Sequence, residues 1–279
     1  MECNWASFLR VLPPRLRQGV ANFEKQGLRE LRLRLGSGAE LVLEDRFWTL
    51  PGMVTREELQ YVLNAASDYS PWAASTAARG YITAPGGHRI GLCGEAVWDR
   101  GQVVGIREPT SLCLRVARDF PGIGRTAGAL GVSLLILGPP GWGKTTLLRD
   151  ICRQISQEEQ VCVVDARGEV FPKGIPRGRR MDVLTGCPKG LGVEMALRTM
   201  TPQWIALDEI TAREDTQALL FAANCGVKLL ATAHAASWDD LTSREIYRPL
   251  VEQGIFSYLL ILQQDKSYRM ERMDKWAIK

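Results

Sequence analysis

Short apolar runs alternate with helix-like segments through the second half of the chain. Four of these runs have the length and composition of strands buried on both faces of a parallel sheet: 132–137, 161–165, 204–208 and 227–232. The helix-like segments between them cover residues 144–156, 192–200 and 214–224. This alternation predicts β-α-β units, in which crossover helices connect parallel strands. Two further runs, at 255–262 and 268–273, are predicted to add edge strands.

The first half of the chain follows a different pattern. Leu31-Arg-Leu-Arg-Leu35 alternates apolar and basic residues, which predicts a strand with one buried face. Thr55-Arg-Glu-Glu58 is a capping box and predicts a helix that runs towards Ala66. Three strands are predicted around turn residues, at 81–84, 88–98 and 103–106. This half is therefore expected to form a small α+β domain.

A stretch rich in Gly and Pro separates the two patterns. The segment Phe120-Pro-Gly-Ile-Gly-Arg-Thr-Ala-Gly128 has the composition of a linker. We therefore predict an α+β domain over residues 1–122 and an α/β domain over residues 123–279.

Composition and charge exclude several classes of protein. Hydrophobic residues at 46% and charged residues at 24% are typical of a globular chain. The longest apolar stretches, 130–138 and 254–262, are too short to cross a bilayer, and residues 1–10 lack the apolar block of a signal peptide, so we expect a soluble, cytosolic protein. The seven scattered cysteines predict neither a disulfide framework nor a zinc cluster. A net charge of +4 permits contact with nucleic acid or acidic lipid without requiring it.

One motif in the chain carries a specific chemistry. Residues 138–145 fit the P-loop pattern G-x-x-x-x-G-K-[ST], directly after an apolar run and at the start of a predicted helix. Glycines let backbone N–H groups turn inward around phosphate, Lys144 is expected to reach the β- and γ-phosphates, and Thr145 to bind Mg²⁺. We therefore predict a site for Mg-ATP whose nucleotide-binding residues are Gly138, Pro139, Pro140, Gly141, Trp142, Gly143, Lys144, Thr145 and Thr146.

Polar residues follow three of the other apolar runs. Asp208 and Glu209 end one run, and at the carboxyl edge of a sheet Asp208 is expected to bind the metal shell and Glu209 to polarise water or position its neighbours. Asp165 and Glu169, after another run, are both candidates for a carboxylate that activates water. His234 ends a third run, where a neutral imidazole is expected to contact the γ-phosphate or its water.

These four boxes, in this order, resemble the secretion-superfamily ATPases, which are RecA-like hexameric motors of type II and type IV secretion and pilus systems. Within that group the chain is similar to the stage III sporulation protein AA family. The similarity covers nearly the whole chain and rests on five stretches, at residues 31–34, 86–91, 138–150, 165–169 and 182–189. Trp142 departs from the small residue expected at its position in the loop.

The resemblance implies a RecA-like P-loop NTPase domain preceded by a smaller α+β domain, and a hexamer with ATP at the subunit boundaries. It also implies a cytoplasmic role beside the membrane proteins of a sporulation channel. By this comparison Glu169 matches a catalytic glutamate, Asp208 and Glu209 the metal-side strand, and His234 the histidine box. Arg89 and Arg115 match, loosely, arginines of the N-terminal domain that reach the phosphates.

We therefore expect an ATPase that powers assembly of, or transport through, a membrane channel. A nucleic-acid motor on the same fold is the alternative, although no stable nucleic-acid complex is expected, and a nucleotide-gated scaffold is a third hypothesis. The basic run at 173–180 is interpreted as a solvated loop, and the aromatic residues at 69–73 as part of a small core. The transported substrate, the ring size and the base selectivity are not predicted.

Overall fold

The computed structural model describes residues 2–3, 5–23, 27–43, 46–67, 80–172 and 174–273. Residues 69–73 and Lys173, to which two of the interpretations above refer, lie outside these ranges. The chain divides into two compact units, Met1–Asp119 with Pro172–Ile175, and Phe120–Phe171 with Pro176–Lys279. Residues 120–122 therefore belong to the second unit, and the short segment Pro172–Ile175 returns to the first.

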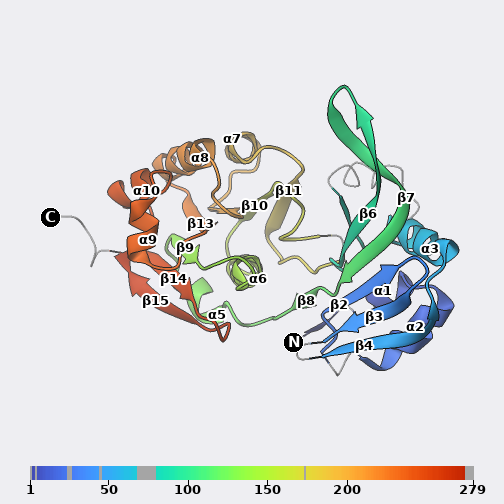
Figure 1. The fold of residues 1–279 in the computed structure, drawn as a ribbon. Helices are drawn as coiled ribbons and strands as arrows, with labels where there is room; N and C mark the ends of the chain where they lie inside the picture. Colours follow the sequence, from blue (N-terminus) through green and yellow to red (C-terminus); the bar gives the residue numbers. More distant parts are fainter. Residues whose placement is uncertain are drawn as a thin grey trace. The chain divides into compact units, whose positions relative to one another are not determined.

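The first unit contains a six-stranded sheet in the order β4-β3-β2-β7-β6-β5, in which every described neighbour pair is antiparallel (Figure 1). Its strands are β2 (Glu30–Arg34), β3 (Gly38–Val42), β4 (Phe47–Met53), β5 (Tyr81–Thr83), β6 (Arg89–Asp99) and β7 (Gln102–Arg115). Strand β7 is much longer than the predicted strand at 103–106, because it forms a ribbon with β6 and then continues into the sheet beside β2. A separate pair joins β1 (Glu2–Cys3) to β8 (Arg118–Asp119).

The helices of the first unit bury one face of this sheet. Those within the described residues are α1 (Trp5–Arg10), α2 (Pro14–Val20), the 3₁₀ helix η1 (Ala21–Phe23) and α3 (Arg56–Ala66). Phe8, Leu16 and Leu59 from α1, α2 and α3 share a core with Leu31 and Leu33 of β2, all fully buried. The alternation along β2 thus places its leucines in the core, as the sequence predicts.

The second unit contains a seven-stranded sheet in the order β11-β10-β12-β13-β9-β14-β15. Its strands are β9 (Leu134–Leu137), β10 (Val161–Asp165), β11 (Met181–Thr185), β12 (Trp204–Leu207), β13 (Lys228–Ala233), β14 (Tyr258–Leu262) and β15 (Tyr268–Arg272). All pairs are parallel except β14 with β15. The prediction of two edge strands in the tail is wrong for β14, which lies inside the sheet beside β9, and correct for β15.

The described helices of the second unit connect these strands, except the first, which precedes β9. They are α5 (Arg125–Gly128), α6 (Lys144–Ile155), α7 (Lys189–Thr199), α8 (Arg213–Asn224), α9 (Trp238–Ser243) and α10 (Arg248–Glu252). Val193 of α7 and Leu219 of α8 share a core with Leu135 and Leu137 of β9, whereas α6 packs on β9, β10 and β13 with side chains outside that cluster. Because the central strands are parallel, their carboxyl ends meet at one edge, where ligands bind in open α/β sheets.

The capping box predicted at Thr55 is present at the start of α3. Thr55 Oγ1 accepts a hydrogen bond from the Glu58 backbone N–H at 3.3 Å, and a Glu58 carboxylate oxygen accepts one from the Thr55 N–H at 3.2 Å. The same carboxylate binds Arg15 of α2 at 2.8 Å, so the box also connects two helices.

Replacing Thr55 by Ala is expected to lower the free energy of unfolding by about 1 kcal/mol, because the first turn of α3 loses its side-chain acceptor. Thr55→Ser keeps the hydroxyl and is expected to retain most of that stability. Chemical denaturation followed by circular dichroism measures both variants, and an Ala variant as stable as the Ser variant would contradict the role of the cap.

Candidate functional site

The loop between β9 and α6 has the backbone geometry of a phosphate cradle. Gly141 and Gly143 lie in the left-handed region, with φ of 76° and 104°, and an added Cβ at either position would meet no heavy atom within 4 Å. Glycine is favoured at both positions by backbone conformation rather than by crowding. Helix α6 begins at Lys144, so its first N–H groups lack helical partners and are available to an anion.

Lys144 is drawn inward, with a side chain that is largely buried. Its Nζ donates hydrogen bonds to the carbonyl oxygens of Gly138 at 2.7 Å and Pro139 at 3.2 Å, and lies 3.1 Å from Nδ1 of His234. Burial lowers the pKa of Lys144, and the charges of Glu209 and Asp208 partly oppose that shift. The loop therefore holds a cation beside the candidate phosphate cradle.

Asp208, directly after β12, meets the start of α6. Thr145 Oγ1 donates to the Asp208 carboxylate at 3.2 Å, and Thr232 Oγ1 lies 3.2 Å from the same group. Burial raises the pKa of Asp208 to about 6, hydrogen bonds from the two threonines lower it, and the nearby charges of Asp165 and Glu169 raise it further. A hydroxyl beside a carboxylate is a donor set that suits Mg²⁺ when phosphate and water oxygens complete the shell.

That incomplete donor set fits a metal that arrives with a phosphate ligand. Within the described ranges no group of three or more His, Cys, Asp or Glu side chains is placed to hold a metal ion. Mg²⁺ is commonly bound through one or two carboxylates plus substrate phosphates rather than in an all-protein cage. The residues at Thr145 and Asp208 therefore fit Mg²⁺ as part of a nucleotide complex.

The loop after β10 presents Glu169 and uses Asp165 to do so. The Asp165 carboxylate accepts hydrogen bonds from the backbone N–H groups of Glu169, Val170 and Phe171 at 2.9, 2.9 and 3.0 Å. Arg149 of α6 donates to the carbonyl oxygens of Val170 at 2.5 Å and Glu169 at 3.0 Å. Of the two candidate carboxylates, Asp165 is thus engaged in fixing the loop, and α6 is tied directly to the turn that carries Glu169.

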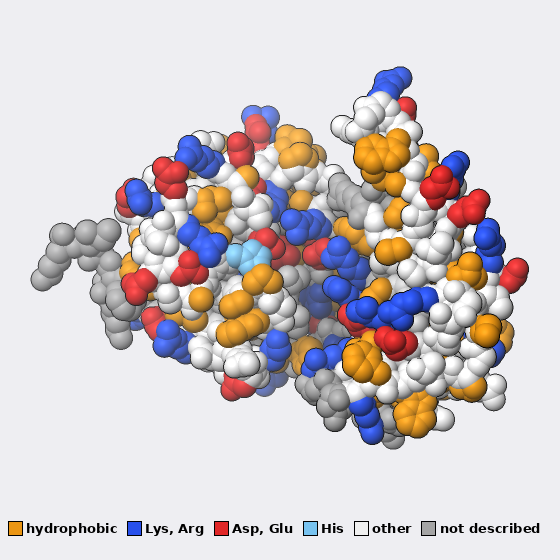
Figure 2. All heavy atoms as spheres, viewed as in Figure 1, with side chains coloured by type: hydrophobic (Ala, Val, Ile, Leu, Met, Phe, Trp, Pro, Cys, Tyr) orange, Lys and Arg blue, Asp and Glu red, His pale blue; other side chains and the backbone are white. Residues whose placement is uncertain are grey.

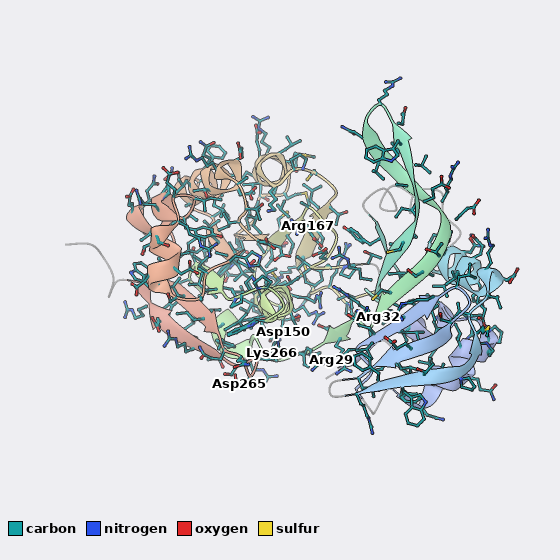
Figure 3. All side chains as sticks on the ribbon, viewed as in Figure 1. Arg29, Arg32, Asp150, Arg167, Asp265 and Lys266 are labelled. Carbon is teal, nitrogen blue, oxygen red and sulfur yellow. The ribbon has the colours of Figure 1, made fainter. Side chains whose placement is uncertain are left out.

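Glu209 and His234 form one connected pair. His234 Nε2 lies 2.9 Å from Glu209 Oε1, while its Nδ1 faces Lys144, so the imidazole bridges a carboxylate and an ammonium group. Arg167, labelled in Figure 3, approaches the other Glu209 oxygen at 4.0 Å. The sequence predicted Glu209 and His234 as separate site residues, and the structure brings them together with Lys144.

Arg89 and Arg115, the two predicted phosphate contacts of the N-terminal domain, are neighbours within the first unit. They are register partners across β6 and β7. The Arg89 guanidinium lies 3.9 Å from the centroid of the Tyr81 ring, and Arg115 Nε lies 3.3 Å from a carboxylate oxygen of Glu30. Their contact with phosphate stays a prediction.

A cavity of about 540 Å³ adjoins the phosphate loop and was not predicted from the sequence. The β14–β15 hairpin closes one side of it, where Lys266, labelled at the turn in Figure 3, donates to the Gly141 carbonyl at 2.8 Å. Trp142, the unexpected bulky residue of the loop, is part of its wall. The other lining residues include Phe120, Ile123, Thr146, Leu147, Leu262 and Tyr268. Its aromatic lining residues are far apart in the sequence, so no local sequence pattern indicates this pocket.

The surface does not present a single type of charge. In the view of Figure 2, basic and acidic side chains are interspersed and hydrophobic ones lie between them, which agrees with the small net charge. Among the helices of the described residues, none is both long enough and apolar enough to span a bilayer.

The parallel sheet, its crossover helices and the loop at its carboxyl edge define a RecA-like domain preceded by a smaller α+β domain. Solved structures share this fold: the Legionella pneumophila ATPase DotB, with a TM-score of 0.59 and 18% identity over 94% of this chain and 81% of that one, and the ADP-bound pilus retraction motor PilT, with a TM-score of 0.63 and 14% identity over 91% and 80%. At these identities the similarity concerns the fold.

The particular family is shown by sequence. The chain belongs to the family described as Sporulation stage III, protein AA, whose profile matches residues 6–271. It is 34% identical to the Stage III sporulation protein AA of Bacillus subtilis (strain 168), over 92% of this chain and 90% of that protein. The family resemblance inferred from the sequence motifs is confirmed.

The raised pKa of Asp208 predicts a pH-dependent stability in the metal-free protein. A carboxyl group whose pKa rises from 3.8 to about 6 on folding adds stability at low pH that is lost as the pH rises through 6. Asp208→Asn removes the charge, so its unfolding free energy relative to wild type is expected to increase between about pH 4 and pH 6.5, by roughly 1–3 kcal/mol.

Thermal unfolding in EDTA at several pH values measures this difference. Asp240→Asn is a suitable control, because an exposed Arg244 and a backbone N–H lower the pKa of Asp240 instead. A difference between Asp208→Asn and wild type that stays constant from about pH 4 to pH 6.5 would refute the assigned shift.

Proposed function

We propose that this protein hydrolyses Mg-ATP and uses the energy to power assembly of, or transport through, a secretion-like membrane channel during sporulation. The observation that carries the proposal is the meeting, at one sheet edge, of the Gly138–Thr145 loop with Asp208 through the contact at Thr145 Oγ1. The channel role rests on family membership, because the curated relative of similar length is a stage III sporulation protein.

Different residues at this sheet edge have different roles in phosphoryl transfer. Lys144, Thr145 and the first N–H groups of α6 bind the β- and γ-phosphates, where positive charge and oriented dipoles stabilise the transition state. Thr145 and Asp208 would hold Mg²⁺, which would neutralise charge on the phosphate oxygens. The lowered pKa of Lys144 reflects burial without a direct anionic partner, which favours a phosphate there.

Glu169 is the carboxylate assigned to the attacking water. Its assignment rests on its match to the catalytic glutamate of the ATPases that the chain resembles. Asp165 accepts hydrogen bonds from three backbone N–H groups, and Glu209 is paired with His234, so these two carboxylates are assigned to holding the site in place. Glu169 stands on a loop fixed at both ends, and its charge acts on Asp208. His234, between Glu209 and Lys144, is placed to respond when Lys144 moves to a phosphate.

The cavity beside the loop is assigned to the base and ribose. Its volume of about 540 Å³ lies within the usual range for ligand sites, and its aromatic walls suit a flat ring. Trp142, inside the phosphate loop, and Tyr268, at the start of β15, both line the cavity. The site therefore provides separate regions for the base and for the triphosphate.

The protein is further proposed to act as a homo-oligomer, with six subunits as in the motors it resembles, in the cytoplasm and beside membrane proteins of the channel. Arg89 and Arg115 are proposed to supply positive charge to the phosphates, since both stand together on one face of β6 and β7. A stable complex with nucleic acid is not part of the proposal.

Lys144→Ala is expected to weaken ATP binding strongly, because the buried ammonium group is removed from the phosphate loop. Glu169→Gln is expected to retain ATP binding and to lower kcat by about 10²-fold or more, the usual contribution of a positioned general base. Steady-state phosphate release and ATP binding by calorimetry measure the two effects.

Lys228→Ala is the matched control for these variants. Lys228 binds Glu159 at 2.9 Å at the opposite, amino-terminal end of β13, so its loss removes an ion pair away from the site. Near-normal turnover in both Lys144→Ala and Glu169→Gln would refute the assigned roles.

Tyr268→Ala is expected to raise KM for ATP by about tenfold while changing kcat little, because a lost stacking wall weakens base binding without touching the phosphates. Tyr258→Ala, on the neighbouring strand and outside the cavity lining, serves as its control. Equal KM values for the two variants would refute the assignment of the base to this cavity.

A further inference from the structure

The segment Gly186-Cys-Pro-Lys189 contributes to the family resemblance but has no role in the site as described so far. Pro188 is the N-cap of α7, and Lys189 is the first residue of that helix. The Lys189 side chain is 11% exposed. A lysine that gives up most of its hydration needs strong partners in exchange.

Lys189 has three acceptors, and all of them lie just beyond β12. Its Nζ donates to the backbone carbonyl of Glu209, to Thr211 Oγ1 at 2.9 Å and to an Asp215 carboxylate oxygen at 3.1 Å. Three hydrogen bonds complete the donor capacity of an ammonium group. The lysine thus connects the start of α7 to the turn between β12 and α8.

The contact with the Glu209 carbonyl matters because that residue has an unfavourable backbone conformation. Glu209 has φ of 49°, in the left-handed region that residues other than glycine enter at a cost of about 1–3 kcal/mol. Its N–H donates to Thr232 Oγ1 at 2.8 Å, and its carbonyl accepts from Lys189. The peptide groups on both sides of the strained residue are therefore held, one from β13 and one from α7.

This conformation sets the direction of the Glu209 side chain. Glu209 faces His234 at 2.9 Å, and His234 in turn contacts Lys144 at 3.1 Å. Lys189 and Glu209 also line one small cleft together with Asp165, Arg167 and Asp208. A change at Lys189 would thus pass through the backbone of Glu209 to the imidazole.

A purely structural role for the lysine, as the partner of Asp215, does not account for all of these contacts. Asp215 already accepts hydrogen bonds from the backbone N–H groups of Thr211 at 2.9 Å and Ala212 at 3.2 Å, so the start of α8 is capped without the lysine. Only the bond to the Glu209 carbonyl reaches the residue that contacts His234.

We propose that Lys189 is a positioning residue, which fixes the left-handed backbone of Glu209 and thereby aims its carboxylate at His234. The catalytic consequence rests on the proposed ATPase function, while the structural consequence does not. The two are tested separately, one by the environment of His234 and the other by turnover.

The first test uses NMR of protein labelled at histidine, which contains only His88 and His234. Glu209→Gln defines how far the His234 ring signals move when the charge beside them is lost. Lys189→Met and Lys189→Gln are expected to move the same signals in the same direction by at least about half as much, because the carboxylate is no longer aimed at the ring. His88 is buried in the first unit, so its signals are expected to stay at the wild-type position in every variant. Circular dichroism and thermal unfolding report whether the second unit, which carries the substitutions, folds.

Lys228→Met is the matched control, since it also removes a lysine ion pair. That pair, Lys228 with Glu159 at 2.9 Å, lies at the other end of β13. Its His234 signals are expected to coincide with those of the wild type. His234 signals that stay at the wild-type position in Lys189→Gln, or in Lys189→Met, would overturn the proposal. The Gln variant keeps a polar group that can bind Asp215, so it decides the matter if the Met variant does not fold.

The second test is a double-mutant cycle on ATP turnover. Lys189→Met is expected to lower kcat by about tenfold with little change in KM, since misplacement of a site residue affects the chemical step. Adding it to Glu209→Gln is expected to lower kcat by less than about twofold further, because both changes remove the same interaction. Reductions that multiply would overturn the proposal, whereas a wild type without turnover would count against the ATPase function and leave the NMR result to decide on Lys189.

Discussion

The hydrogen bond between Thr145 Oγ1 and the Asp208 carboxylate, at 3.2 Å, joins the two halves of the site. Thr145 belongs to the first turn of α6, and Asp208 follows β12, so the contact forms only if the parallel sheet brings the phosphate loop beside that strand end. In the sheet, only β13 lies between β9, which leads into the phosphate loop, and β12, which ends before Asp208. Strand β13 also supplies Thr232, which donates a hydrogen bond to the same carboxylate. The arrangement of the remaining polar groups follows from this junction.

Burial gives these groups unusual properties. Asp208 and Lys144 lie in the same small region. Desolvation raises the pKa of Asp208 and lowers the pKa of Lys144, and both shifts favour the neutral form of the side chain. Desolvation destabilises both charged groups, and a bound anion beside Lys144 together with a bound cation beside Asp208 would stabilise them. In the same region Glu209 adopts a strained backbone conformation, which is common where function rather than stability selects the geometry.

Much of this arrangement follows from the sequence in physical terms. The P-loop glycines, the apolar runs and the polar residues that end them indicate the sheet and its active edge, because parallel strands place such residues together. Two features could not be predicted from the sequence. Strand β11 consists mainly of half-buried residues and has no clear hydrophobic period. Trp142 lines a cavity together with Tyr268, which is distant in sequence. The role of Lys189 likewise depends on a carbonyl twenty residues away.

The central claim is that a triphosphate and its metal bind between Lys144 and Asp208. A crystal structure with Mn²⁺ and a non-hydrolysable ATP analogue tests this most directly, because anomalous scattering locates the metal independently of the nucleotide. The account predicts an anomalous peak beside Thr145 Oγ1 and Asp208, with the phosphates on the Gly138–Thr145 loop. Nucleotide bound elsewhere, or a metal with no ligand from either residue, would contradict it.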